Sequence, residues 1–125
     1  MKRILILGAA GSIARIATSL FLDETDAQLT LFVRNARRLG KIDSSRARVV
    51  EGDVLDADGL REAMAGQDVV YANLAGDLER MAKTIVDAMH ATGVRRLIFI
   101  SSMGIYGEVP GQKYSSVLDP YRKAA

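Results

Sequence analysis

The sequence contains no cysteine and a single histidine, His90. Without cysteine the chain forms neither a disulfide framework nor a thiolate metal site, and one histidine excludes a zinc site built from several imidazoles. No apolar run approaches the roughly 18 residues that span a membrane, and we expect no signal peptide before the first strand. These absences favour a cytoplasmic protein that uses neither a metal nor a membrane.

The sequence also lacks a large excess of positive or negative charge. The chain has 17 lysine and arginine residues against 15 aspartate and glutamate residues, a net charge of +2 at pH 7. This balance gives no reason to expect nucleic acid as a partner, although basic side chains gather between residues 34 and 48. With 125 residues, of which 49% are hydrophobic, the chain is long enough for one folded domain. Whether that domain forms a homo-oligomer stays open.

Short apolar segments recur along the chain. Their apolar residues are consecutive rather than alternating, a pattern typical of strands that are covered on both faces. Five such strands are predicted, at Ile4 to Leu7, Leu29 to Val33, Arg48 to Glu51, Val69 to Ala72, and Leu97 to Ile100. Helical segments are predicted between most of them, at Ser12 to Leu22, for one turn at Ala36 to Leu39, after a cap at Asp56 with a stop at Gly66, and after a cap at Asp77 with a stop at Gly93.

Alternation of strands and helices predicts an α/β fold with a doubly wound parallel sheet and right-handed crossovers. The ligand site of such a sheet lies beyond the carboxyl ends of its strands. At the C-terminus, Asp119 and Pro120 resemble the start of another helix, and no further strand follows. We therefore expect residues 1–125 to be one domain of this kind that is cut short after its fifth strand, without its substrate-side segment. A minimal five-stranded domain is the alternative.

The most informative segment is the junction Gly8-Ala9-Ala10-Gly11-Ser12-Ile13-Ala14, between the first strand and the first helix. Small residues allow a sharp turn, and the helix N-terminus then offers unpaired N–H groups and a positive dipole end to an anion. A pyrophosphate fits this arrangement. We assign cofactor binding to Gly8, Ala10, Gly11, Ser12 and Ile13. The spacing G-x-x-G-x-x-A departs from G-x-G-x-x-G, so a plain tight turn is the alternative.

The second strand ends at Arg34-Asn35. Domains selective for NAD place an acidic residue about 20 residues past the glycine loop, where it binds the ribose hydroxyls. No acid lies between Leu29 and Ala36, and Arg34 occupies that place, with Arg37 and Arg38 close by. A guanidinium suits the 2′-phosphate of NADP, so we predict NADP as cofactor, with NAD as the alternative. A solvated surface arginine is the other interpretation of Arg34.

The third and fourth strands lead into segments that suit the rest of a dinucleotide. The carboxylate of Asp53 can accept a hydrogen bond from an adenine amine, with Val54 against the ring. Asn73, Leu74 and Ala75 are followed by Gly76 in a segment that allows the backbone close to the ribose and phosphates. The alternatives are a turn-forming aspartate and an ordinary loop.

The fifth strand leads into Ser101 and Ser102. Hydroxyl groups at a strand exit face the crevice, where they can bind a substrate carbonyl, although serine is also a common turn residue. We assign Ser101 to cofactor binding and take Ser102 as a candidate to bind the substrate carbonyl.

Taken together, four segments occur in the order and spacing of the short-chain dehydrogenase/reductases: the glycine loop, Gly52-Asp53-Val54, 73–76, and Ser101-Ser102-Met103-Gly104-Ile105-Tyr106-Gly107. The chain most resembles the extended and atypical branches of this family, including epimerase/dehydratase-like and NmrA-like proteins. The resemblance implies a Rossmann fold, NAD(P) binding and, by position, a catalytic serine at Ser102.

The active site of this family also needs Y-x-x-x-K, in which lysine lowers the pKa of a catalytic tyrosine from about 10. Pro120-Tyr121 resembles the start of that motif, but residue 125 is alanine. Two hypotheses follow. In the first, an oxidoreductase transfers hydride between NADPH and a small carbonyl, quinone or flavin-like acceptor, with Tyr121 or Tyr114 as proton donor. In the second, the chain is a non-catalytic NADP(H) redox sensor that binds a protein partner.

Overall fold

Strands and helices alternate along residues 2–42 and 44–100, the part of the chain that the computed structural model describes. The strands are β1 (Arg3–Leu7), β2 (Gln28–Val33), β3 (Ala47–Glu51), β4 (Val69–Asn73) and β5 (Arg96–Ile100). The helices are α1 (Ser12–Glu24), α2 (Ala57–Met64) and α3 (Leu78–Thr92), with a 3-10 turn, η1 (Ala36–Arg38). All neighbouring strands pair in parallel, in the order β3-β2-β1-β4-β5. The predicted doubly wound α/β sheet is confirmed.

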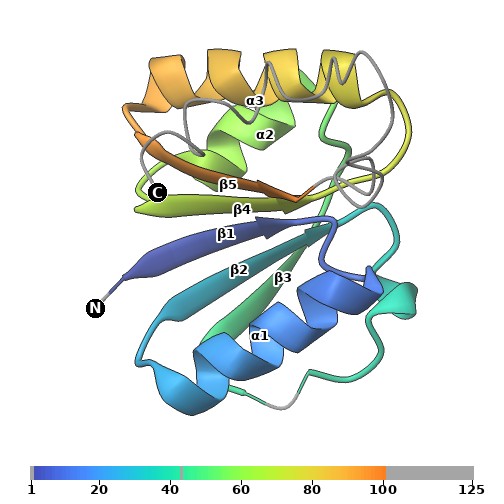
Figure 1. The fold of residues 1–125 in the computed structure, drawn as a ribbon, viewed down its shortest axis with the longest axis vertical. Coiled ribbons are helices and arrows are strands. Elements are labelled where there is room, and N and C mark those ends of the chain that lie inside the picture. The colour runs from blue at the N-terminus through green and yellow to red at the C-terminus, as the bar shows by residue number, and fades with distance from the viewer. Residues whose placement is uncertain (1, 43, 101–125) are drawn as a thin grey trace, which may run out of the picture.

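The sheet lies between two layers of helices. Helix α1 packs on one face, and α2 and α3 pack on the other (Figure 1). The chain starts at the central strand β1, moves outward through β2 and β3, and returns across β1 to β4. Right-handed crossovers in opposite directions place their helices on opposite faces. The strand order reverses between β1 and β4, so a crevice is expected beyond the carboxyl ends of these two strands.

Consecutive apolar residues of β1 face opposite layers, as a strand covered on both faces requires. Leu5 and Leu7 belong to the core beneath α2 and α3, whereas Ile4 and Ile6 belong to the core beneath α1. For the edge strands the prediction of two covered faces is wrong, since Val49 in β3 and Ile98 in β5 are 39% and 44% exposed. Both are paired with residues of the α1 core. One helix about 10 Å wide cannot cover five strands spaced about 4.8 Å apart.

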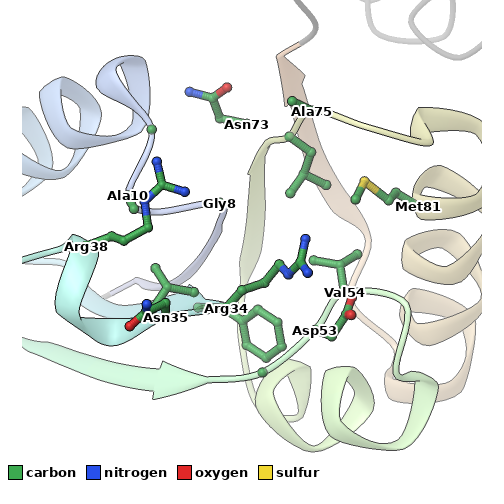
Figure 2. A pocket seen from close by; sticks show the side chains of 15 residues that line it. Gly8, Ala10, Arg34, Asn35, Arg38, Asp53, Val54, Asn73, Ala75 and Met81 are labelled. Atoms are coloured by element: carbon green, nitrogen blue, oxygen red, sulfur yellow. The ribbon is translucent and has the colours of Figure 1, made fainter.

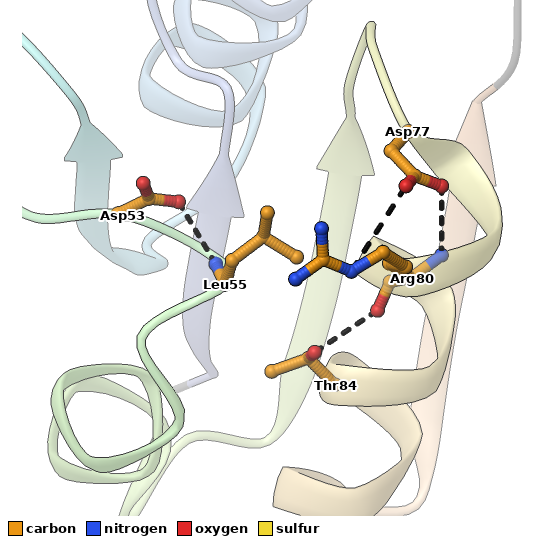
Figure 3. Close-up of polar contacts among 5 residues, drawn as sticks. All are labelled: Asp53, Leu55, Asp77, Arg80 and Thr84. Atoms are coloured by element: carbon orange, nitrogen blue, oxygen red, sulfur yellow. Dashed lines mark hydrogen bonds and ion pairs between the residues drawn. The ribbon is translucent and has the colours of Figure 1, made fainter.

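The helix ends follow the capping predictions. Oδ1 of Asp56 accepts from the backbone N–H of Gly59 at 3.4 Å, and Oδ1 of Asp77 accepts from that of Arg80 at 3.2 Å (Figure 3). Helix α1 differs from α2 and α3, because its N-cap is Gly11, which has no side chain to accept a hydrogen bond. The first turn of α1 is therefore left with free N–H donors.

Each of the five strands is one residue longer than predicted, and the ends of α1 and of the turn after β2 also shift by one or two residues. Helix α1 continues to Glu24 rather than ending at Leu22. The guanidinium of Arg46 donates to the carbonyl oxygens of Thr25 and Ala27 at 2.8 and 3.1 Å, and this contact holds the chain just beyond the helix. The turn after β2 ends at Arg38, one residue earlier than predicted.

Gly8 forms the sharp turn between β1 and α1. Its φ of +72° lies in the left-handed region. A Cβ atom at this position would lie 2.0 Å from the carbonyl oxygen of Asn73, at the end of β4. The turn therefore requires glycine both for its backbone conformation and for the close approach of two chain segments.

Gly8→Ala should lower the free energy of unfolding by more than about 3 kcal/mol, because the left-handed strain and the clash with Asn73 add up. Gly66→Ala is the matched control: Gly66 has a φ of +80° and open space around its Cβ position, so it isolates the backbone strain. We expect this control to cost about 1 kcal/mol. Urea unfolding of the full chain measures both variants, and equal losses would show that the clash with Asn73 is relieved at no cost.

Tyr71 generates a second prediction. Its side chain is 8% exposed and packs edge-on against Phe21, with ring centroids 6.1 Å apart. Burial raises the pKa of Tyr71 above its usual 10.0. The unfolded tyrosine ionises first as pH rises, so this residue destabilises the fold only above about pH 10. The unfolding free energy of the wild type should fall more steeply than that of Tyr71→Phe between about pH 9 and pH 11. Parallel pH profiles would contradict this.

Candidate cofactor site

A pocket of about 610 Å³ lies beyond the carboxyl ends of the central strands. Figure 2 shows side chains from segments far apart in the sequence converging on it. The lining residues follow four strands in turn: Gly8, Ala10 and Gly11 after β1, Arg34, Asn35 and Arg38 after β2, Gly52, Asp53 and Val54 after β3, and Asn73, Leu74 and Ala75 at β4. The pocket thus occupies the place predicted from the strand order, and it contains ten of the residues assigned to cofactor binding from the sequence.

Backbone hydrogen bonds attach the glycine loop to β2. The backbone N–H groups of Gly8 and Ala9 donate to the carbonyl oxygen of Phe32 at 3.2 and 3.3 Å. The first hydrogen bond of α1 runs from Arg15 N to the carbonyl oxygen of Gly11 at 2.9 Å. The N–H groups of residues 12–14 precede that bond, so they remain available to an anion at the positive end of the helix dipole.

Gly52 and Phe32 shape the floor of the pocket. A Cβ atom on Gly52 would lie 2.6 Å from Cζ of Phe32, whose ring is almost fully buried. The N–H of Gly52 donates to the carbonyl oxygen of Val33 at 2.8 Å, which fixes the exit of β3 beside β2. Glycine at position 52 therefore lets the chain pass directly over the aromatic ring.

Arg34 and Arg38 provide the positive charge of the pocket. The guanidinium of Arg34 extends toward Val54, and that of Arg38 extends toward Ala10 (Figure 2). Among the described residues, neither group has a carboxylate within ion-pair distance. Arg37 lies between them in sequence but does not line the pocket. Of the three arginines that the sequence places together, the structure brings two into the site.

Asp53 and Val54 line the pocket at the segment that follows β3. Oδ1 of Asp53 accepts from the backbone N–H of Leu55 at 2.9 Å (Figure 3). The aspartate thus stabilises the turn after β3, the structural role considered in the sequence analysis, while it also lines the pocket. Val54 is only 5% exposed and forms an apolar surface beside it.

Five lining residues are absent from the assignments to cofactor binding made on sequence alone: Phe32, Val33, Arg38, Gly52 and Met81. Arg38 and Gly52 stand next to assigned residues, in the basic segment after β2 and in the Gly52-Asp53-Val54 motif. Phe32 and Val33 belong to the buried end of β2, and Met81 belongs to the apolar face of α3. Met81 is a core residue, as its place in the helix pattern predicts, and it reaches the pocket as well. Its position at the start of α3, next to the loop after β4, is the signal that could have identified it.

Some assigned residues are not part of the lining. Ser12 and Ile13 begin α1 and their side chains are exposed, so the role assigned to their backbone N–H groups stays a prediction. Ser101, Ser102, Tyr114 and Tyr121 lie outside the described residues, and their assignments stay predictions.

Within 2–42 and 44–100, no group of three or more histidine, aspartate or glutamate side chains could hold a metal ion. Over these ranges, no helix combines the length and the apolar composition needed to cross a membrane.

Comparisons with known proteins agree with this geometry. A Rossmann-fold NAD(P)-binding family protein from Shigella flexneri is 40% identical, with a TM-score of 0.81, and the match covers 95% of this chain and 60% of that one. A wide-type short-chain dehydrogenase/reductase from Veillonella parvula, solved in complex with NADP, is 35% identical with a TM-score of 0.76, and the match covers 94% and 55%.

A curated relative, the photosystem II assembly factor Ycf39 of Cyanophora paradoxa, is 26% identical over 96% of this chain and 41% of its own length. The chain thus spans three fifths or less of each of these three proteins. The profile of the NAD(P)H-binding family matches residues 8–125. The glycine loop, the pocket and this match lead to one conclusion: the chain belongs to the NAD(P)H-binding family and is an NAD(P)-binding domain of the Rossmann type.

Proposed function

We propose that this chain prefers NADP(H) to NAD(H) and forms the cofactor domain of an oxidoreductase. The reaction is hydride transfer between NADPH and a small carbonyl, quinone or flavin-like acceptor. The observation that carries the cofactor preference is the pair of guanidinium groups, Arg34 and Arg38, in the pocket after β2. An acidic residue at the end of β2 would instead favour the free ribose hydroxyls of NAD.

The residues of the pocket fit the parts of such a cofactor. The free N–H groups at the start of α1 suit the pyrophosphate, and the Gly8 turn leaves room that a side chain would fill. Arg34 and Arg38 suit the 2′-phosphate, because guanidinium groups form charge-assisted hydrogen bonds with phosphate oxygens. Asp53 and Val54 suit the adenine. A bound nicotinamide gives or accepts the hydride, and the relative from Veillonella parvula, solved with NADP, supports this assignment.

For the reaction we propose Ser102 as the hydroxyl that polarises the acceptor oxygen, with Tyr121 or Tyr114 as proton donor. These roles rest on the resemblance of 101–107 and Pro120-Tyr121 to short-chain reductases. A hydrogen bond to the acceptor oxygen stabilises the negative charge that develops there during hydride transfer.

A second candidate function is a non-catalytic NADP(H) sensor that binds another protein. One observation favours it: none of the four tyrosines has lysine four residues later, since those positions hold Ala75, Pro110, Leu118 and Ala125. The relative Ycf39 is called a photosystem II assembly factor, and a role of that kind would agree with this second candidate. In this function, occupancy of the pocket would change the affinity for the partner.

Arg34→Ala should raise the Kd for NADPH about 10- to 100-fold, because it removes a charge-assisted contact to the 2′-phosphate. The Kd for NADH should change by less than about twofold, since NADH lacks that phosphate. Arg37→Ala is the matched control: it removes the same charge from the neighbouring turn, outside the pocket lining. Titration by fluorescence or calorimetry measures all four affinities. Equal weakening of NADPH and NADH by Arg34→Ala would refute the role in 2′-phosphate binding.

Ser102→Ala tests the reaction. We expect the full chain to oxidise NADPH with at least one member of a panel of quinones, flavins and small carbonyls. The variant should lose about 100-fold in kcat while its Kd for NADPH stays unchanged. Ser101→Ala provides the comparison, and it should change the affinity more than the turnover. Binding of NADPH without oxidation by any acceptor would favour the sensor.

A further inference from the structure

The two arginines of the pocket sit on one short segment, Arg34–Arg38, which we call the arginine arm. Its first half is attached to β3: the backbone N–H of Ala36 donates to Oε2 of Glu51 at 2.9 Å. Glu51 is the last residue of β3 and is paired in register with Val33, the last residue of β2. The carboxylate therefore reaches across from the edge strand to the start of η1.

The second half of the arm is attached to α1. The Arg15 guanidinium donates to the carbonyl oxygen of Arg38 and, through Nε, to that of Ala10 at 3.0 Å. Within the arm, Oδ1 of Asn35 accepts from the N–H of Arg37 at 3.1 Å. Leu39, which follows, is 6% exposed and anchors the segment in the core. Side chains from outside the arm thus hold it at its middle residue, Ala36, and at its last residue, Arg38.

Glu51 is unexpected in this place on grounds of charge alone. It puts a carboxylate on the strand next to two arginines that we assign to a phosphate. A negative charge near an anion site weakens anion binding, and Glu51 itself does not line the pocket. The hydrogen bond to Ala36 is the contact through which Glu51 can favour the site.

We infer that Glu51 is a positioning residue for cofactor choice. By accepting the N–H of Ala36, it holds η1 beside β3 so that the segment presents both Arg34 and Arg38 to the pocket. This inference rests on the proposed preference for NADP(H). Glu51 therefore raises the affinity for NADPH despite its negative charge. It leaves the affinity for NADH unchanged, because NADH has no 2′-phosphate for the two guanidinium groups to bind.

Two explanations of Glu51 predict effects of opposite sign. If only its charge matters, Glu51→Ala and Glu51→Gln both tighten NADPH binding by removing a repulsion. If the hydrogen bond matters, Glu51→Ala weakens NADPH binding, whereas Glu51→Gln retains an acceptor for the N–H of Ala36 and rescues it. Glu62→Ala is the matched control, because it removes an equal charge from the exposed face of α2, outside the pocket.

The experiment is titration of the full chain with NADPH and with NADH, for the wild type and these three variants. For Glu51→Ala we expect the Kd for NADPH to rise about fivefold and that for NADH to change by less than about twofold. Glu51→Gln and Glu62→Ala should keep the wild-type preference. An unchanged or tighter affinity of Glu51→Ala for NADPH would overturn the inference.

A measurement without cofactor separates this inference from the proposed function. Amide hydrogen exchange at Ala36 should accelerate in Glu51→Ala but not in Glu51→Gln. Equal exchange rates in both variants would show that Glu51 does not hold η1 through this hydrogen bond. If the wild type binds NADPH and NADH equally well, the proposed preference fails and the role of Glu51 in cofactor choice falls with it. If the wild type prefers NADPH and Glu51→Ala retains that preference, the inference alone fails.

Discussion

The close approach of Gly8 to the carbonyl oxygen of Asn73 is the constraint on which the rest of the site depends. It brings the ends of β1 and β4 together where the strand order reverses. A side chain at position 8 would push these segments apart and shift the start of α1. Because the same turn leads directly into the start of α1, one steric requirement sets both the packing of the sheet and the place of the helix N-terminus beside the pocket.

The three helices show how local sequence separates a structural helix end from a binding one. Asp56 and Asp77 satisfy N–H groups at the starts of α2 and α3. At the corresponding place α1 has Gly11, without a capping side chain and with no acidic residue in its first turn. A missing cap costs about 1 kcal/mol of helix stability. A phosphate that accepts hydrogen bonds from the same N–H groups offsets this cost when it binds, so part of the helix stability is linked to occupancy of the site.

Most of the fold could be predicted from short-range patterns, since consecutive apolar residues, aspartate caps and glycine stops act over a few residues. The glycine loop and Asp53 could be identified from the sequence for the same reason. The features that could not be predicted depend on the register of neighbouring strands and on the direction in which side chains point. The sequence does not show that Arg38 rather than Arg37 turns into the pocket, because this follows from the tight geometry of η1. Nor does it show that Glu51 meets Ala36, which requires the pairing of β2 with β3.

The arginine arm also bears on how a cofactor without a 2′-phosphate would be discriminated. Arg34 and Arg38 bring two like charges into one pocket, so they repel each other when it is empty, although water screens much of that repulsion. A phosphate monoester carries about −1.5 to −2 charges near pH 7 and can neutralise both groups. A ribose hydroxyl makes neutral hydrogen bonds and leaves the two positive charges of the pocket without a counter-charge. The preference would then arise from an attraction gained with one cofactor and from a repulsion retained with the other, which is how specificity is commonly built.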